Sequence, residues 1–491
     1  MREILQSTYR NVFLLGLLVF LLTAYFSIGY FHPDEHFQIF EFCNYKLGRS
    51  PLSDLPWEYN EHMRPTLQPA MVYAFIQVFG VDDPFRVALV FRLLSAVLCW
   101  YITARISLLL LPQFKSDKGK TYFIAANYFL WFIPLISVRF SSENFSAIAL
   151  LMGLYALIKE EIDGKEAARS ALLWSGFLFG LSFFFRFQMG FAFVGLAGWL
   201  LFIRKMNVQR ILFLVMGGMG ALLLGTLCDR WFYGDWYCSP YQYFFANIIQ
   251  QKAAGFGIEP WWYYFSSFIQ LAIPPISVML LVLLLLGAFK QKRNVFLWLL
   301  VPFVLAHSAV GHKELRFLFP MIFALIYFAA LGLDAWIVSG KALLVQRIVL
   351  FICLLLNVPL LIGRSFIPAQ ETIAYHRYLY YQYKEPITLL GREKDLYYIA
   401  ELNANFYRSK QITSKAMEND SAIVAYLTEQ HPERILLFEQ ELKNGAIQYQ
   451  GYKRQRVYCL FPDWLLSLNF NNWQQRSRIW SVWELKAIPE S

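Results

Sequence analysis

Two carboxylates stand directly after the first long apolar segment of the chain. This segment covers about residues 11–30, and His32-Pro33-Asp34-Glu35 follows it. A soluble surface does not require a carboxylate pair there, whereas a group that exchanges protons at a membrane surface does, and charges at the mouth of a membrane bundle are functional candidates. The motif therefore predicts acid–base chemistry at one face of a membrane.

Similar polar clusters follow other apolar segments. An arginine or lysine at a bilayer surface can hold a phosphate diester, a carboxylate can deprotonate an acceptor hydroxyl, and aromatic rings can pack on sugar faces. Together these groups predict transfer from a lipid-linked phosphate. The clusters comprise Arg64; residues 139–144; Arg186 with Gln188; Asp229 with Trp261 and Tyr263; and His312, Lys313, Glu314 and Arg316.

Each cluster alone has a simpler explanation. Arg139, Arg186 and Arg316 could be interfacial anchors, the aromatic residues 261–264 could form an interfacial belt, and Asp34 with Glu35 could cap a helix. Coincidence explains the whole set poorly, because all the clusters fall on one set of connections. We therefore expect them to lie on the same side of the membrane.

The composition is that of a polytopic α-helical membrane protein. Hydrophobic residues make up 57% of the chain and charged residues only 16%, against about 25% charged in soluble domains. About eleven apolar segments approach or exceed the roughly 17 residues that a bilayer core requires. They are about 11–30, 87–111, 121–138, 144–158, 170–185, 188–203, 211–227, 264–289, 295–311, 317–338 and 343–362.

Basic residues gather in every second connection, so the net charge of +10 does not indicate nucleic-acid binding. The positive-inside rule places these connections and the N-terminus in the cytoplasm. An odd number of spans then leaves the C-terminal region in the periplasm or lumen. The basic connections are around 2–10, 115–120, 159–169, 204–210, 290–293 and 341–347.

Two long external connections are expected, at 31–85 and 228–263. Within the first, residues 36–46 and 67–79 have the period of amphipathic helices that lie in the membrane interface. We expect these connections to belong to a transmembrane catalytic domain over 1–365.

The composition becomes mostly polar near residue 367. Short apolar runs at 434–438, 456–460 and 479–485 predict strands, and the patterns at 371–383 and 416–430 predict helices. Residues 366–491 are therefore expected to form a small external α/β domain of about 120 residues.

The cysteines and the N-terminal segment indicate neither a metal site nor a removed leader. No CxxC or zinc-type spacing occurs. Pairing of Cys228 with Cys238 is the less favoured alternative to buried free thiols. The first apolar segment has no small-residue cleavage site and is expected to be an uncleaved first span.

Five motifs occur in order between about residues 30 and 320, and with them the chain resembles glycosyltransferase family 22, the dolichyl-phosphate-mannose-dependent mannosyltransferases. They are His32-Pro33-Asp34-Glu35 with Phe37-Gln38 and Glu41; Trp57-Glu58 with Arg64-Pro65 and Gln68-Pro69; Asp229 with Phe232-Tyr233-Gly234, Pro240, Tyr243-Phe244 and Asn247; Phe256-Gly257 with Pro260-Trp261-Trp262-Tyr263-Tyr264; and Gly311-His312-Lys313-Glu314-Leu315-Arg316-Phe317.

The resemblance implies a GT-C fold, an inverting mechanism, and no metal ion or other cofactor. It makes Asp34 the base that activates the acceptor hydroxyl, with Glu35 supporting it or exchanging roles, since an inverting displacement needs one base opposite the leaving group. Glu314 would contact substrate or hold Arg316. Donor-phosphate or substrate contacts are implied for His32, Arg64, Arg186, Asp229, His312, Lys313 and Arg316, and groove-lining roles for Trp261 and Tyr263.

The motifs are most similar to those of the GPI mannosyltransferases that add the third mannose. Trp262 stands where the family usually has His, and Leu315 where it has Glu or Phe, so the acceptor stays open. The short cytoplasmic connections resemble those of bacterial members, which implies a bacterial inner membrane, with the endoplasmic reticulum as the eukaryotic alternative. The implied partners are a polyprenyl-phosphate sugar, a glycan or glycolipid acceptor, and membrane lipid.

Three other functions compete with this one. A transporter of lipid-linked sugars is expected to carry broken helices and inverted repeats; no repeat is evident, and Pro134 and Pro274-Pro275 are the candidate breaks. A non-catalytic scaffold does not require Asp34 or Glu35. A related GT-C enzyme that uses another polyprenyl-phosphate sugar stays open, because no residue identifies the hydroxyls of the sugar.

Overall fold

The computed structural model describes all residues except 290, 441–447, 469, 478 and 489–491, so Lys290 of the basic connections lies outside the described residues. Two compact units divide the chain. The helical unit contains Met1–Ser27, Trp57–Val81 and Val87–Ile367, and the mixed unit contains Ile28–Pro56, Asp82–Arg86 and Pro368–Ser491. Residues 28–56, which we expected in the transmembrane domain, therefore group with the C-terminal part of the chain.

Each of the predicted apolar segments contains helix. Segments 121–138 and 264–289 are each broken into two helices. The described α-helices of the helical unit are α1 (Arg2–Gln6), α2 (Arg10–Phe26), α5 (Leu67–Phe79), α6 (Pro84–Leu110), α7 (Asp117–Phe129), α8 (Phe132–Ser137), α9 (Ser142–Asp163), α10 (Arg169–Phe185), α11 (Met189–Gly198), α12 (Val208–Tyr233), α13 (Ser239–Phe244), α14 (Tyr263–Leu271), α15 (Ile276–Phe289), α16 (Val295–Ala309), α17 (Ile322–Ser339) and α18 (Leu343–Phe366). The first turn of α6 belongs to the mixed unit, and a 3-10 helix, η8, covers Leu315–Met321.

Among the residues that the structure describes, four helical stretches are long and apolar enough to cross a membrane: Pro84–Gln113, Val208–Tyr233, Leu315–Ser339 and Leu343–Gln382. Shorter apolar helices accompany them, among them Arg10–Phe26 and Arg169–Phe185. The protein is thus an integral membrane protein, and the count of about eleven spans stays a prediction.

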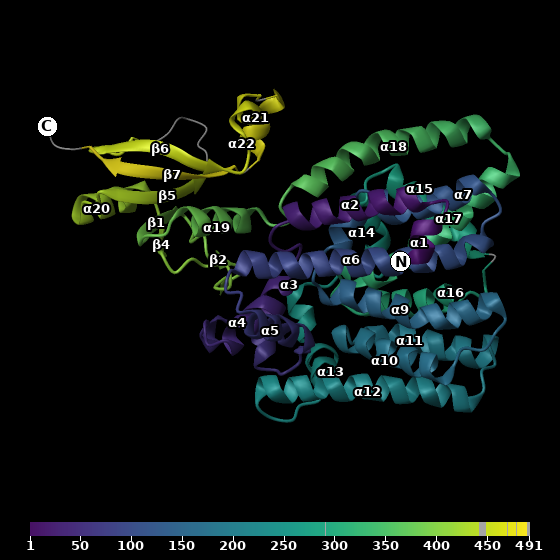
Figure 1. Cartoon of the computed structure of the whole chain (residues 1–491). Helices are drawn as coiled ribbons and strands as arrows, with labels where there is room; N and C mark the ends of the chain where they lie inside the picture. The colour runs from purple at the N-terminus through teal and green to yellow at the C-terminus, as the bar shows by residue number, and fades with distance from the viewer. Residues whose placement is uncertain (290, 441–447, 469, 478, 489–491) are drawn as a thin grey trace. The chain divides into compact units, whose positions relative to one another are not determined.

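Glycines allow two of these helices to approach closely. In Figure 1, α10, α11 and α12 lie side by side. A Cβ atom on Gly176 of α10 would lie 1.9 Å from the Leu214 carbonyl oxygen of α12, and one on Gly217 would lie 2.0 Å from the Leu173 oxygen of α10. Small residues permit such backbone contact in membrane bundles.

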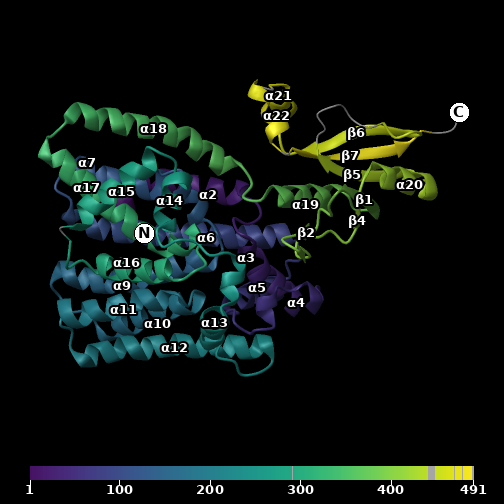
Figure 2. The same cartoon turned by 180° about the vertical axis from the view of Figure 1, so that it is seen from behind.

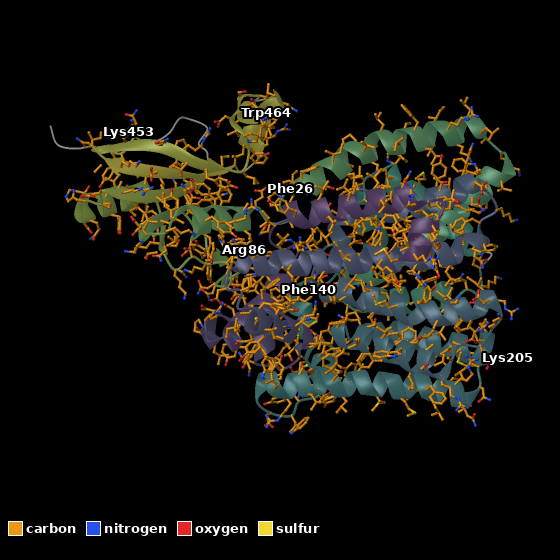
Figure 3. The ribbon with its side chains drawn as sticks, in the orientation of Figure 1. Phe26, Arg86, Phe140, Lys205, Lys453 and Trp464 are labelled. Atoms are coloured by element: carbon orange, nitrogen blue, oxygen red, sulfur yellow. The ribbon has the colours of Figure 1, made fainter. Side chains whose placement is uncertain are left out.

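The two ends of the helical unit carry different side chains. Phe140, just before α9, lies at one end and Lys205, just before α12, at the other (Figure 3). At the Lys205 end, Glu160 accepts hydrogen bonds from Arg204 at 2.9 Å and from Arg210 at 2.5 Å. At the Phe140 end, the start of α9 meets the end of α10, where the Ser146 and Ser182 hydroxyls lie 3.2 Å apart. The predicted polar and basic connections at 139–144 and 204–210 therefore lie at opposite ends.

The mixed unit is built on a five-stranded sheet of order β4-β1-β5-β7-β6, in which β4, β1 and β5 are parallel and β7 is antiparallel to both neighbours. Figure 2 shows β6, β7 and β5 side by side. The predicted strands correspond to β5, β6 and β7, whereas β1 and β4 were not predicted. The elements are β1 (Ile387–Arg392), β2 (Tyr398–Ile399), β3 (Leu402–Asn403), β4 (Ile412–Met417), β5 (Arg434–Gln440), β6 (Tyr452–Cys459), β7 (Trp480–Ala487), α19 (Glu371–Gln382), α20 (Asp420–Gln430), α21 (Asp463–Ser467) and α22 (Trp473–Arg476).

Alternate residues of the central strands face two separate cores. Leu389 and Leu436 pack with Leu379 of α19, whereas Leu390 and Leu437 pack with residues of α20 such as Ile423 and Leu427. Because successive strand residues point to opposite faces, the two helices cover opposite faces of the sheet. The predicted small α/β fold is therefore present in this unit.

The connection after α2 is part of the mixed unit. It forms α3 (Pro33–Glu35), the π-helix η1 (His36–Glu41) and α4 (Phe42–Lys46). Phe37, Phe40 and Phe42 are buried in the protein, and the Phe40 ring packs on Phe406 of the same unit at 4.9 Å. The position of residues 36–46 in the membrane interface is still a prediction from the sequence.

Candidate active site

A chain of ion pairs joins three of the predicted polar clusters in the helical unit. Glu143 lies in the first turn of α9, Arg186 directly follows α10, and Arg316 lies in η8. A single oxygen, Glu143 Oε1, accepts from Arg186 Nη1 at 2.7 Å and from Arg316 Nη1 at 3.1 Å. Arg316 Nε donates to Glu314 Oε2 at 2.7 Å, and His312 Nε2 lies 3.1 Å from Glu314 Oε1. We call Arg186, Glu143, Arg316, Glu314 and His312 the ion-pair chain.

Helix ends bring these charges together. Ser141 caps α9 by accepting from the Asn144 backbone N–H at 3.3 Å, and the positive N-terminus of a helix favours a carboxylate such as Glu143. The Phe317 ring lies beneath both guanidinium groups, 5.0 Å from the Arg186 Cζ and 5.3 Å from the Arg316 Cζ. This ring orients the two guanidinium planes by cation–π contact.

Several buried donors beside the chain have no hydrogen-bond partner among the described residues. They are the Nε and Nη2 atoms of Arg186 and the Tyr264 hydroxyl. Arg186 is 6% exposed and Tyr264 3%, and Tyr264 lies within electrostatic range of Arg186 and Glu314. Buried donors normally find partners, so this arrangement is suited to a bound acceptor such as a phosphate oxygen.

The ion-pair chain favours the protonated form of its histidine. The hydrogen bond to Glu314 raises the pKa of His312 above its ordinary value, and burial opposes the shift only in part. When His312 is protonated, the cluster has three positive side chains, because Arg186 and Arg316 are also cationic. They face only two carboxylates, those of Glu143 and Glu314. The ion-pair chain therefore favours the binding of an anion.

Arg64 lies in a second cluster of the helical unit. Its Nη2 donates to Glu58 Oε1 at 3.2 Å, and its Cζ lies 5.7 Å from the centroid of the Tyr243 ring. The Tyr243 hydroxyl accepts from the Gln188 side chain, two residues beyond Arg186. These contacts link Arg64 to the element that carries Arg186.

Two predicted substrate residues, Lys313 and Asp229, form hydrogen bonds that hold neighbouring loops. The Lys313 ammonium donates to the carbonyl oxygens of Glu259 at 2.7 Å, Val310 at 2.5 Å and Gly311 at 3.3 Å, and burial lowers the pKa of Lys313. Asp229 accepts from the backbone N–H and hydroxyl of Thr66, at 2.9 and 2.7 Å, and from the Ser239 hydroxyl at 2.6 Å. In this structure both side chains connect loops. Glu314 pairs with Arg316, which was one of the two expected roles.

The predicted groove residues differ in exposure. Trp261 is 64% exposed, Tyr263 is half-buried, and both lie where the 257–260 connection enters α14. Lys313 and His312 hold this connection, since His312 Nδ1 also lies 3.4 Å from the Gly257 carbonyl oxygen. The aromatic residues are thus attached to the element that carries Arg316.

The mixed unit carries the carboxylate motif. His32 caps α3, because its Nδ1 accepts from the Asp34 N–H at 3.3 Å, and this nitrogen also lies 3.6 Å from Asp34 Oδ1. Asp34 is about a quarter exposed, whereas Glu35 is buried and accepts from the Phe31 N–H at 3.2 Å. Asp34 can therefore meet a solvent-borne substrate, and Glu35 stabilises the turn.

The prediction from sequence missed the central residue of the ion-pair chain. Glu143 belonged to a predicted cluster and Tyr264 to a predicted motif, but neither residue was assigned a role. One sequence feature could have identified Glu143: it is a carboxylate three residues after Phe140, at the start of a long apolar run. All six cysteines are free, so Cys228 and Cys238 form no disulfide.

The chain is similar to mannosyltransferases over most of its length. Mannosyltransferase APTG1 of Arabidopsis thaliana is 26% identical over 68% of this chain and 60% of that protein. GPI mannosyltransferase 3 of Yarrowia lipolytica is 27% identical, over 60% and 56%, and GPI alpha-1,2-mannosyltransferase 3 of Bos taurus is 24% identical, over 60% and 53%. The matches span somewhat more than half the length of these curated relatives.

The fold has a solved counterpart. ArnT from Cupriavidus metallidurans, in a crystal structure bound to undecaprenyl phosphate, superposes with a TM-score of 0.54 at 11% identity, over 97% of this chain and 98% of that one. The fold is that of GT-C enzymes. The family model described as the Alg9-like mannosyltransferase family matches residues 12–387, and this protein belongs to that family.

Proposed function

We propose that this protein transfers mannose from a polyprenyl-phosphate mannose donor to a hydroxyl of a glycan or glycolipid, with inversion, on the external face of the membrane. The observation that carries the proposal is the ion-pair chain with the buried donors of Arg186 that lack a protein partner. Family membership and the undecaprenyl phosphate of the ArnT structure support a donor of this kind.

The reaction divides into bond changes that these residues can assist. The acceptor oxygen forms a bond to C1 of mannose while the bond from C1 to the phosphate oxygen breaks, and the electron pair leaves with the phosphate. The leaving phosphate gains one negative charge, which Arg186, Arg316 and protonated His312 stabilise, because preorganised cations act where charge develops. No strong general acid is required, since a phosphate is a good leaving group.

Asp34 is assigned the proton transfer. Its carboxylate takes the proton of the acceptor hydroxyl as that oxygen attacks, and Glu35 stabilises the turn that carries Asp34. His32 caps the same turn. Trp261 and Tyr263 are assigned to the packing of sugar or isoprene groups.

The test uses the purified protein in lipid with polyprenyl-phosphate mannose and a panel of acceptors. The relatives named GPI mannosyltransferase 3 make a mannose-terminated glycolipid the first acceptor to try. Transfer is expected from the wild type and not from Asp34→Asn. Normal turnover by Asp34→Asn would exclude Asp34 as the base, and absence of transfer from every polyprenyl-phosphate sugar would favour a transporter.

A second donor class stays under consideration. The described side chains suit a phosphate and a sugar, and they suit mannose, arabinose and glucose equally. Parallel assays with polyprenyl-phosphate arabinose and glucose separate these donors.

A further inference from the structure

A buried histidine–carboxylate contact directly follows the Asp34-Glu35 motif in the chain. His36 Nε2 lies 2.9 Å from Glu41 Oε1, and each side chain is 1% exposed. The two residues are five apart, which would place them about 140° apart around an α-helix. Residues 36–41 instead form a π-helix, whose wider turn brings positions i and i+5 to one side. Single π-helical turns occur frequently at functional sites.

Residues 403–407 of the C-terminal part hold the same pair, and we call them the 403–407 segment. The Tyr407 ring stacks on the His36 ring at 5.3 Å and 12°, and the Tyr30 ring stacks on it at 5.4 Å and 24°. The Phe406 backbone N–H donates to Glu41 Oε1 at 2.7 Å. His36 and Glu41 therefore join the 403–407 segment to the helix that follows the carboxylate motif.

Further contacts anchor the segment on either side. The side-chain amides of Asn403 and Asn405 donate to the two carboxylate oxygens of Asp54, at 3.0 and 2.7 Å. The Phe406 ring packs on Phe40 at 4.9 Å. The segment thus contacts the 28–56 connection along its length rather than at one point.

The pair is sensitive to loss of either member. A buried carboxylate is destabilised when it loses the groups that contact and hydrogen-bond it. Glu41 has His36, the Phe406 N–H and the Ser50 hydroxyl, which donates to Glu41 Oε2 at 3.3 Å. Removing the charge of Glu41 therefore releases His36, the residue next to Glu35.

We infer that Glu41 is a positioning residue: through His36 and Tyr407 it ties the 31–36 turn to the 403–407 segment and fixes the orientation of Asp34. The inference rests on the proposed function, in which Asp34 is the base. It assigns part of the C-terminal α/β domain to the positioning of that base. A shift of about 1 Å in a reacting group can lower the rate about 100-fold, so turnover is the sensitive quantity.

The test compares three variants of the full chain in lipid. Glu41→Gln keeps an oxygen for the Phe406 N–H but removes the charge beside His36. Tyr407→Leu removes the stacked ring, and Tyr407→Phe keeps it. Glu41→Gln and Tyr407→Leu are expected to accelerate amide hydrogen exchange over residues 31–36 and to lower kcat, each at least about tenfold, with the KM for polyprenyl-phosphate mannose unchanged. Tyr407→Phe is expected to behave as the wild type.

Glu439→Gln is the matched control. Its carboxylate is as buried as that of Glu41, but it lies in β5 and pairs with Arg454 and Arg392. Exchange over residues 31–36 is expected to stay unchanged in this variant. The inference is overturned if Glu41→Gln and Tyr407→Leu leave exchange over residues 31–36 or kcat at the wild-type value.

The proposed function fails if the wild-type protein transfers no mannose, and this result would be known before the variants are compared. Hydrogen exchange then decides the positioning role alone: faster exchange over 31–36 supports it, and unchanged exchange overturns it. Should Glu41→Gln fail to fold, Tyr407→Leu compared with Tyr407→Phe gives the same decision.

Discussion

At the residue scale, one carboxylate organises the anion-binding end of the helical unit. Glu143 Oε1 receives hydrogen bonds from both Arg186 and Arg316, which leaves other guanidinium atoms of Arg186 available to a ligand. Arg186 differs from a lysine because its planar fork can serve a protein carboxylate and a phosphate at once.

Arg186→Lys is therefore expected to weaken the reaction strongly despite conserving charge. A lysine at this position cannot hold Glu143 and a phosphate oxygen with fixed geometry, so kcat/KM should fall about 100-fold. Steady-state kinetics with polyprenyl-phosphate mannose measure the loss. Arg204→Gln, which removes an arginine paired with Glu160 at the opposite end of the unit, is the control and should retain turnover.

His312 should make donor binding depend on pH. Glu314 raises the pKa of His312, so its charge is fully present below about pH 6.5, the ordinary value, and is lost as pH rises through the raised pKa. Affinity for the anionic donor is expected to fall over this range above pH 6.5. Titration of donor Kd against pH checks this, and His312→Gln should flatten the curve; an unchanged curve would contradict the assignment.

At the element scale, polar side chains hold the connections, while small residues set the helix spacing. Lys313 satisfies the backbone carbonyl oxygens of Glu259, Val310 and Gly311. Asp229 fixes the connection at Thr66 to α12. The sequence could not reveal these roles, because a lysine beside a histidine and a glutamate has the same appearance whether it binds backbone or phosphate.

Lys313→Met should consequently reduce stability as well as activity. The variant keeps an apolar stem of similar length but leaves three carbonyl oxygens without their cationic donor, which is expected to lower the free energy of unfolding by about 2 kcal/mol. Thermal unfolding in detergent, with Lys205→Met at the exposed opposite end as control, measures the difference. An unchanged midpoint together with lost donor binding would instead favour a direct phosphate contact.

The contact between α10 and α12 should tolerate no side chain at Gly217. Because a Cβ there would lie 2.0 Å from the Leu173 oxygen, Gly217→Ala is expected to destabilise the protein by about 1–3 kcal/mol or more. Gly220→Ala on the same helix is the matched control, since its nearest described neighbour, a ring carbon of Phe177, would lie at 3.7 Å. Thermal unfolding of the two variants should differ clearly, and equal midpoints would contradict the packing argument.

At the scale of the whole molecule, the alternation of polar and basic connections predicts orientation. Trp261 and Lys453 are exposed residues expected outside, and Lys205 is an exposed residue expected in the cytoplasm. In a background with the native cysteines replaced, a membrane-impermeant thiol reagent should label Trp261→Cys and Lys453→Cys in intact cells. It should label Lys205→Cys only after permeabilisation. Labelling of Lys453→Cys only after permeabilisation would contradict the odd number of spans.

The sequence by itself determined the membrane class, the places of the apolar helices and the order of the motifs. These follow from local properties: the length of an apolar run, the positions of lysine and arginine, and the spacing of residues such as His32 to Glu35. The predicted strands at 434–438, 456–460 and 479–485 were found for the same reason, whereas β1 and β4, with the mixed patterns ITLLGR and ITSKAM, were not.

Only the tertiary structure decided which charges meet. It joined Glu143, Arg186 and Arg316 in one ion-pair chain, directed Lys313 to backbone carbonyls, and placed residues 28–56 with the C-terminal part through the Glu41, His36 and Tyr407 contacts. The physical reason is that a hydrogen bond acts over about 3 Å. Partners more than 300 residues apart in the chain, such as Glu41 and Phe406, leave no local pattern from which their contact could be predicted.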